Sequence, residues 1–275
     1  MAIFSKLIPP LATSLTVQAI FASIFVPLQD DRCYDLGGTI GFLTTTFVSV
    51  YYPTLRASFE AGKLLPLPSL SNLAPRQLLL TSSLAFWTSR LGLFLFQRAL
   101  QSGGDSRFDR IKRRPARFTT SWMIQGVWTF LVGMPVYLSN AVPPRLHPAL
   151  SFRDYLGFGI FAGSFLLEAL ADYQKSKWKR EKNLKKHSER FIKTGVWSIS
   201  RHPNYLGEIG IWTGLWLLST RGLQASGSPR AAAAVSAISP LFTYFILNKV
   251  SGIPLIENAN NKKFANDPEW LRYKQ

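Results

Sequence analysis

Long apolar stretches recur along this chain and constrain its fold more than any other feature. A membrane-spanning helix needs about 20 mostly apolar residues, and most of the seven stretches in this sequence approach or exceed that length. They cover residues 7–28, 36–52, 78–96, 119–142, 155–171, 205–219 and 231–250. Several contain or adjoin proline, which neighbouring helices accommodate within a membrane. We therefore expect an all-α, multispan transmembrane bundle of about seven helices.

The first stretch has an alternative interpretation as a secretory signal, with Ala22-Ser23 near a cleavage point. Its apolar part is too long for such a signal, and six further stretches follow. We therefore interpret it as the first span.

The distribution of basic residues indicates how the chain is oriented. Lys and Arg number 32 against 15 Asp and Glu, a net charge of +17. On a soluble protein this charge would indicate a nucleic-acid partner, but here 47% of residues are hydrophobic and only 17% are charged. The loops after the first, third and fifth stretches, together with the C-terminal tail, hold 23 of the basic residues, whereas the other side holds 8. Because basic loops stay cytoplasmic, we expect a cytosolic C-terminus, membrane lipids as partners and no nucleic acid.

A polar, glycine-containing segment at residues 101–117 is typical of a linker. We therefore predict N-terminal membrane helices over residues 1–113, about three spans with the linker, and a second membrane domain over residues 114–275. Cys33 is the only cysteine, which excludes an internal disulfide framework and a multi-cysteine zinc site. We expect no metal.

Residues 157–162 match the G-x-G-x-x-A form of a dinucleotide-binding fingerprint. That fingerprint works only at a turn from strand to helix, whereas here it lies inside an apolar stretch with no strand before it. We instead expect glycines spaced four apart to let membrane helices approach closely. The two pairs are Gly159 with Gly163 and Gly210 with Gly214.

Four ionisable residues share one helical face that begins in the fifth stretch: Glu168, Asp172, Lys175 and Lys179. Carboxylates at membrane depth are costly and usually face a cavity or a partner. We therefore predict a functional role for Glu168, as a substrate-lining candidate, and for Asp172, with a salt-bridged helix end as the alternative. Lys175 and Lys179 continue this face and are kept as cofactor-binding candidates. Gln125 is a second substrate-lining candidate, with a helix-packing amide as its alternative. The remaining basic residues nearby, together with Trp178, are interpreted as interface residues: Lys177, Arg180, Lys182, Lys185 and Lys186.

A second polar cluster surrounds the start of the sixth stretch. Pro203 suits the first position of a helix, because its missing N–H would have no partner there. Arg201 and His202 then lie at a helix N-terminus, where free N–H groups and the helix dipole attract anions. This combination suits a phosphate-bearing cofactor. Its amide or ribose groups would bond to the polar residues that follow: Asn204, Tyr205 and Glu208.

Residues 200–208 read Ser-Arg-His-Pro-Asn-Tyr-Leu-Gly-Glu. They resemble the signature of the membrane steroid 5α-reductase/DUF1295 superfamily, which is related to sterol C14-reductases and isoprenylcysteine methyltransferases. Further matching segments are Arg114-Pro-Ala-Arg-Phe118 with Trp122 and Gln125, Leu170-Ala-Asp-Tyr-Gln-Lys175, and Gly252-Ile-Pro-Leu-Ile-Glu257 with Tyr273.

This resemblance covers residues 114–275 and implies a multispan fold with a cytosol-facing pocket for NADPH. For a eukaryotic source it implies the endoplasmic reticulum. Residue by residue it implies cofactor contacts at Asp172, Lys179, Arg201, His202, Asn204, Tyr205 and Glu208, with Glu257 and Tyr273 as weaker candidates.

One part of the family pattern is missing. Steroid 5α-reductases hold a ketone with a Glu/Tyr pair, but Glu60 is the only acidic residue between Asp35 and Asp105, and no motif surrounds it. The substrate is therefore expected only as an apolar lipid or steroid-like molecule. The catalytic residues stay unknown, with three tyrosines as candidates for the acid: Tyr137, Tyr155 and Tyr173.

The sequence leaves three functions open. The first is an NADPH-dependent reductase of a carbon–carbon double bond. It is favoured by Asn204 with Glu208 and by the face that carries Asp172 and Lys179. The second is an S-adenosylmethionine-dependent membrane methyltransferase, because the His-Pro-x-Tyr element occurs in that branch too. The third is a non-catalytic sterol-binding protein with the same fold.

Overall fold

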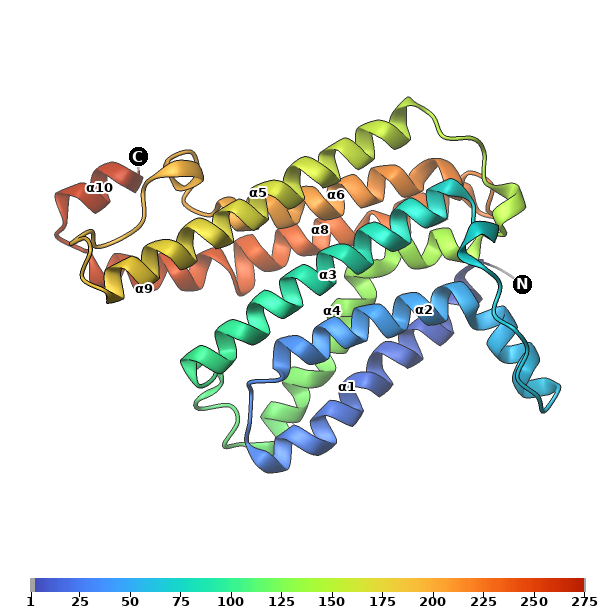
Figure 1. Cartoon of the computed structure of the whole chain (residues 1–275), viewed down its shortest axis with the longest axis horizontal. Coiled ribbons are helices and arrows are strands. Elements are labelled where there is room, and N and C mark those ends of the chain that lie inside the picture. Colours follow the sequence, from blue (N-terminus) through green and yellow to red (C-terminus); the bar gives the residue numbers. More distant parts are fainter. Residues whose placement is uncertain (1–2, 275) are drawn as a thin grey trace. The chain divides into compact units, whose positions relative to one another are not determined.

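The computed structural model describes residues 3–274, and every regular element in that range is a helix (Figure 1). The longer helices are α1 (Ile8–Leu28), α2 (Tyr34–Glu60), α3 (Pro75–Ser102), α4 (Pro115–Ala141), α5 (Phe152–Asn183) and α6 (Pro203–Leu223). Shorter helices follow: α7 (Pro229–Ser236), α8 (Ile238–Phe245), α9 (Ile253–Lys263) and α10 (Pro268–Lys274). The all-α prediction is therefore confirmed.

Within residues 3–274, four helical stretches are long and apolar enough to cross a membrane, namely Ile3–Leu28, Pro75–Ser102, Phe152–Asn183 and Pro229–Lys263. The chain is thus a multi-pass membrane protein. The other three expected spans coincide with α2, α4 and α6, and the total of seven spans stays a prediction.

Proline marks where several of these helices begin. Pro75, Pro115, Pro203 and Pro229 each occupy the first position of a helix, where the missing N–H costs no hydrogen bond. The prediction for Pro203 is therefore confirmed. Pro53 and Pro135 lie inside α2 and α4, which continue past them, as expected within a packed membrane bundle.

The helices form two compact units. Unit 1 comprises residues 1–155 and 216–239, and unit 2 comprises residues 156–215 and 240–275. The division predicted at residue 113 is not one of these boundaries, because it lies inside unit 1.

The linker segment shows why unit 1 continues across residue 113. The buried Asp31 carboxylate accepts a hydrogen bond from the backbone N of Asp105 at 2.6 Å and pairs with Lys112 at 2.7 Å. Aromatic rings of Tyr34, Phe108 and Trp122 pack beside this anchor. The segment is thus tied to the turn between α1 and α2.

Within unit 1, α4 packs against α1, α2, α3 and α7. Its middle is buried on several sides, since Val132, Val136 and Leu138 are each 0% exposed. Unit 1 also holds a fully buried ion pair. It joins Arg76 of α3 to Asp154 of α5, with an N–O distance of 2.6 Å. Arg76 also donates to backbone carbonyls of Pro148 and Ala149.

Within unit 2, glycines of α6 allow a close approach to α5. A Cβ atom at Gly214 would lie 2.5 Å from the backbone N of Phe161, and one at Gly210 would lie 2.1 Å from Oγ of Ser164. The prediction for this pair is confirmed. It is wrong for Gly159 and Gly163, where a Cβ atom would meet only open space. The contact on α5 uses other positions of the helix, and it brings the N-terminal half of α6 along the carboxylate-bearing part of α5.

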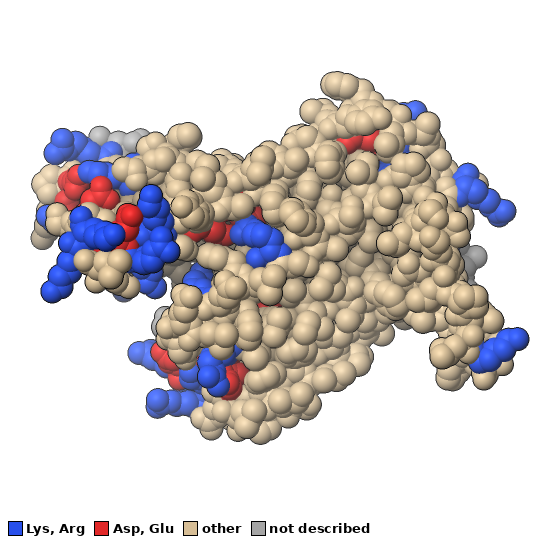
Figure 2. Space-filling model, viewed as in Figure 1, with Lys and Arg blue, Asp and Glu red and all other residues tan. Residues whose placement is uncertain are grey.

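Charged side chains of unit 2 gather over the end formed by α9 and α10 (Figure 2). The same end receives the C-terminal turns of α5 and the start of α6 (Figure 1). This polar end of unit 2 is where the candidate site lies.

Candidate functional site

A cavity of about 410 Å³ lies at the polar end of unit 2. Its walls come from the last turns of α5, from the loop between α5 and α6, and from α9 and α10. Six Lys or Arg side chains and one Glu line it: Lys175, Lys179, Lys182, Arg190, Arg201, Lys263 and Glu257. We call it the cationic cavity. Because its charge is strongly positive, it can hold an anionic ligand.

The single carboxylate of this cavity lies between two of its basic groups. Oε1 of Glu257 accepts a hydrogen bond from Nε of Arg201 at 3.1 Å and lies 2.8 Å from Nε2 of His202. Since a carboxylate only accepts, Nε2 of a neutral His202 carries the hydrogen. Arg201 also donates to the carbonyl oxygen of Lys274 at 2.6 Å. These bonds join the start of α6 to α9 and to the end of α10.

Burial controls the charge of His202, whose side chain is 11% exposed. Loss of hydration lowers the pKa of His202 below its ordinary value, although Glu257 opposes this shift. The ring stacks on Tyr205 with centroids 5.8 Å apart. The neutral imidazole therefore donates to Glu257 through Nε2 and leaves Nδ1 as a hydrogen-bond acceptor at the mouth of α6.

An aromatic cluster forms the apolar wall of the cavity. The ring of Phe191 packs against Trp270 and stacks on Tyr273, with centroids 5.2 and 5.4 Å apart. The Tyr273 hydroxyl donates to the carbonyl oxygen of Trp197, and burial raises the pKa of that hydroxyl. Nζ of Lys175 lies 4.8 Å from the ring centroid of Trp197. Such a wall of rings beside cations can take the flat, partly apolar groups of a nucleotide.

The loop between α5 and α6 is fastened on both sides. Trp197 donates from Nε1 to the carbonyl oxygen of Ala171 on α5 at 3.1 Å. Toward α10, Arg190 pairs with Asp267 at 2.7 Å, and Lys193 pairs with Glu269. The loop therefore holds a defined shape around the cavity.

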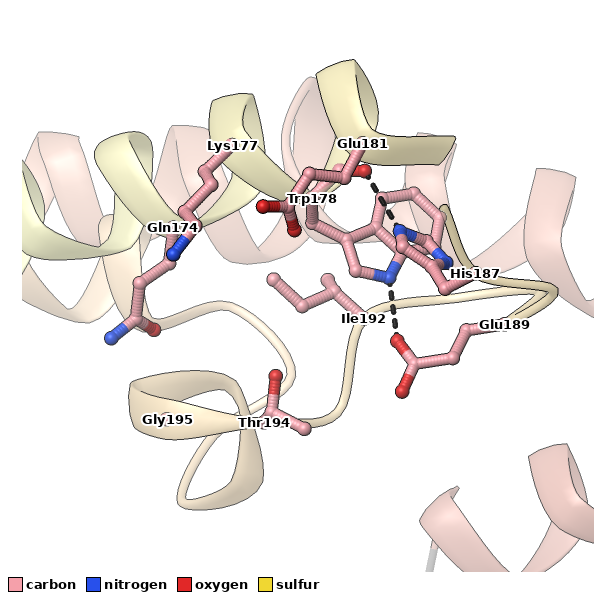
Figure 3. A pocket seen from close by; sticks show the side chains of 9 residues that line it. All are labelled: Gln174, Lys177, Trp178, Glu181, His187, Glu189, Ile192, Thr194 and Gly195. Atoms are coloured by element: carbon pink, nitrogen blue, oxygen red, sulfur yellow. Dashed lines mark hydrogen bonds between the residues drawn. The ribbon is translucent and has the colours of Figure 1, made fainter. Parts of the chain in front are cut away.

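A second cavity of about 340 Å³ adjoins the same part of α5 (Figure 3). Its lining is Gln174, Lys177, Trp178, Glu181, His187, Glu189, Ile192, Thr194 and Gly195. We call it the mixed cavity, because acidic, basic and neutral polar groups all line it. It shares Trp178 and Ile192 with the cationic cavity.

Six of the ten cofactor-binding candidates line the cationic cavity: Lys175, Lys179, Arg201, His202, Glu257 and Tyr273. The other four do not line it. Asp172 lies on α5, and Asn204, Tyr205 and Glu208 lie on α6, all of them partly buried. Of these, Tyr205 is tied to the cavity through its stacking on His202.

The two substrate-lining candidates lie in different units. Glu168 is 3% exposed on α5, and its Cβ atom packs beneath Gly207 of α6. Gln125 is buried in unit 1, where a Cβ atom at Gly38 would lie 2.8 Å from its Nε2. This tight packing favours the helix-packing alternative for Gln125.

The three candidate acids are not among the residues that line the cationic cavity. Tyr137 is buried within unit 1, whereas Tyr155 and Tyr173 are exposed. The identity of the proton donor therefore stays open.

Sequence reasoning missed several residues of the cavity. Lys182 was assigned to the membrane interface, and Asn260 and Lys263 were not considered, yet all three line it. Helical spacing could have indicated the last two, because Asn260 follows Glu257 by three residues on α9 and Lys263 follows Asn260 by three. No local pattern marked Arg190 or Phe191, which the loop carries to the cavity.

Within the residues that the structure describes, no group of three His, Cys, Asp or Glu residues is arranged to hold a metal ion. The donors present are cationic and aromatic, and they suit a phosphate-bearing organic ligand better than a cation.

Comparison with known proteins identifies a family. A family model described as "Protein of unknown function (DUF1295)" matches residues 47–275. Nothing matches among curated proteins or among solved structures. The match covers α3 to α10 completely and includes all the residues that line both cavities. The chain therefore belongs to the DUF1295 family.

Proposed function

We propose that this protein is a membrane-embedded, NADPH-dependent reductase of a carbon–carbon double bond in an apolar lipid or steroid-like substrate. The observation that carries the proposal is the cationic cavity, in which six Lys or Arg side chains face one carboxylate. The resemblance of residues 200–208 to the steroid 5α-reductase superfamily supplies the reaction class.

The donors of the cavity fit the phosphates of NADPH. Arg201 and Lys179 would hold phosphate oxygens by charge-assisted hydrogen bonds, and the N–H groups at the start of α6 would add to them. The aromatic wall of Trp197 and Tyr273 would exclude water from a flat ring. When bound, NADPH supplies the hydride, and the substrate takes up one further proton from a donor that stays open.

Charge distinguishes this proposal from methyl transfer. S-Adenosylmethionine carries a sulfonium, an ammonium and one carboxylate, so it is itself a net cation and has no phosphate. A cavity with a surplus of Lys and Arg repels such a ligand. A non-catalytic sterol-binding protein is likewise less well supported, because an apolar sterol gains nothing from this cluster of cations.

The proposal includes a location and an orientation. The loops that carry most basic residues, and the cavity with them, would face the cytosol, where NADPH is available. The endoplasmic reticulum is the proposed compartment for a eukaryotic source. The apolar substrate would enter from the lipid.

Ligand binding to the full chain in detergent tests this function. We expect NADPH to raise the melting temperature of the protein, because a ligand that binds only the folded state stabilises it. S-Adenosylmethionine should leave the melting temperature unchanged. Stabilisation by the methyl donor alone would overturn the proposal, and lipid profiling of a deletion strain should show an accumulated unsaturated precursor.

Two variants locate the binding. Lys179→Ala and Arg201→Ala should each weaken NADPH binding by about 10-fold or more, since each removes a charge-assisted contact. Arg145→Ala, at an exposed position of unit 1, removes the same charge elsewhere and should leave the affinity unchanged. Equal NADPH affinities in all three variants would show that NADPH does not bind in the cationic cavity.

A further inference from the structure

The mixed cavity differs from the cationic cavity in charge although the two share a wall. Glu181 and Glu189 both line it, against a single lysine, Lys177. A phosphate group is therefore disfavoured there, whereas an uncharged group that carries hydrogen-bond donors is favoured. Its volume of about 340 Å³ lies within the range of small-molecule sites, about 300–1,000 Å³.

The polar groups of this cavity are held in place while keeping some capacity for a ligand. Oε1 of Gln174 accepts a hydrogen bond from the backbone N of Val196 at 3.0 Å, which leaves its amide NH₂ as a donor. Gly195 permits this contact, since its φ is +62° and a Cβ atom there would lie 2.5 Å from the Gln174 amide. One oxygen of Glu189 accepts from Nε1 of Trp178 at 2.7 Å.

Glu181 and His187 have the most hydrogen-bonding capacity left for a ligand. The Glu181 carboxylate points from α5 into the cavity (Figure 3), and no side-chain hydrogen bond or ion pair holds it within residues 3–274. His187 contacts the carbonyl oxygen of Trp178 through Nε2, at 3.1 Å. Its buried Nδ1 has no partner among the described residues.

We propose that the mixed cavity binds the adenine base of the dinucleotide whose phosphates occupy the cationic cavity. This assignment rests on the proposed function and adds the recognition of the base to it. The exocyclic amine of adenine would donate to the Glu181 carboxylate, and a ring nitrogen would accept from the Gln174 amide or the Thr194 hydroxyl. Glutamine side chains pair with adenine nitrogens, and carboxylates accept from an exocyclic amine in the case of cytosine, which is the same donor chemistry.

The shared wall explains how one ligand reaches both cavities. Trp178 and Ile192 border each of them, so a dinucleotide can pass beside these side chains without leaving unit 2. Charge then sets its direction. The phosphates stay with Lys179 and Arg201, and the uncharged base lies beside the two glutamates.

An analogue of NADPH that carries hypoxanthine in place of adenine tests this assignment. Hypoxanthine replaces the exocyclic amine by a carbonyl oxygen, which would face the Glu181 carboxylate without a hydrogen between them. The affinities of both ligands are measured on the full chain in detergent. We expect the wild-type protein to bind the analogue at least about 10-fold more weakly than NADPH, because a hydrogen bond to a charged group is lost.

Two variants complete the design. Glu181→Gln should narrow the gap to less than about 3-fold, since an amide accepts from the amine of adenine and donates to the oxygen of hypoxanthine. Glu60→Gln makes the same change at the exposed end of α2 in unit 1 and should preserve the gap.

The outcomes separate the two proposals. Binding of NADPH with equal affinity for the analogue, or with a gap that Glu181→Gln leaves intact, overturns the adenine assignment alone. Failure of NADPH to bind the wild-type protein overturns the reductase proposal itself.

Discussion

At the scale of single residues, the burial of His202 beside Glu257 determines how the cationic cavity responds to pH. The sequence around His202 identified this histidine and its neighbour Arg201. Glu257 lies 55 positions further along the chain, and only folding brings its carboxylate to 2.8 Å from the ring. The burial that lowers the pKa of His202 likewise depends on α9 and α10.

We predict that His202 makes the folded protein less stable at acidic pH. The pKa of this group is lower in the folded protein than its ordinary value of about 6.5. As the pH falls through 6.5 toward the folded pKa, the unfolded chain takes up a proton that the folded protein does not. The contribution of His202 to the free energy of unfolding should therefore be complete above pH 6.5 and should decrease as the pH falls from 6.5 toward the folded pKa.

Melting temperatures in detergent between pH 5 and 8 check this prediction. His202→Gln should show a smaller acid loss than the wild-type protein. Burial also lowers the pKa of His147 in unit 1, so His147→Gln should remove a separate part of the loss. An acid loss in His202→Gln as large as in the wild type would contradict the assignment.

At the scale of elements, the close packing of α6 against α5 fixes the position of the helices that carry the candidate site. The close contacts at Gly207, Gly210 and Gly214 align the two helices along the span that carries Glu168. Glycine spacing predicted one side of this contact correctly. It misplaced the other side, because spacing does not say which face of α5 the partner covers.

A matched pair of substitutions tests this packing. Gly214→Ala places a Cβ atom 2.5 Å from the backbone N of Phe161 and 2.7 Å from the carbonyl oxygen of Gly157. Since backbone atoms must shift, we expect a loss of about 1–3 kcal/mol in stability. Gly159→Ala makes the same change on α5 where space is open, so it should be neutral or stabilise by up to about 1 kcal/mol.

The melting temperatures of the two variants, measured in the same detergent, test whether α5 and α6 meet at Gly214. Equal melting temperatures, or a lower one for Gly159→Ala, would show that the helices do not meet at Gly214.

At the scale of the whole molecule, the distribution of basic residues predicts orientation in the membrane. The polar end of unit 2, with its loop and C-terminal tail, belongs to the side that holds 23 of the 32 basic residues. The loop between α2 and α3 belongs to the other side. These assignments follow from charge alone, and the structure contributes the exposed positions at which they can be tested.

Single cysteines in a Cys33→Ser background test the orientation in sealed vesicles. Ser188→Cys lies at an exposed position between α5 and α6, and Leu64→Cys lies at one between α2 and α3. A membrane-impermeant maleimide should label Ser188→Cys from the cytosolic side only and Leu64→Cys from the opposite side only. Labelling of both from one side would overturn the expected order of spans.

The sequence by itself determined the helical class and the start of α6, because apolar length and proline act locally. It also indicated the basic residues at the mouth of that helix. Only the tertiary structure decided that Arg190, Glu257 and Lys263 share one cavity and that Glu181 faces another. These residues come from a loop and from helices far apart in the sequence, and their meeting depends on contacts such as Trp197 with Ala171 and Arg190 with Asp267. Local patterns do not encode such contacts, because helical periodicity fixes which residues share a face but not what that face meets.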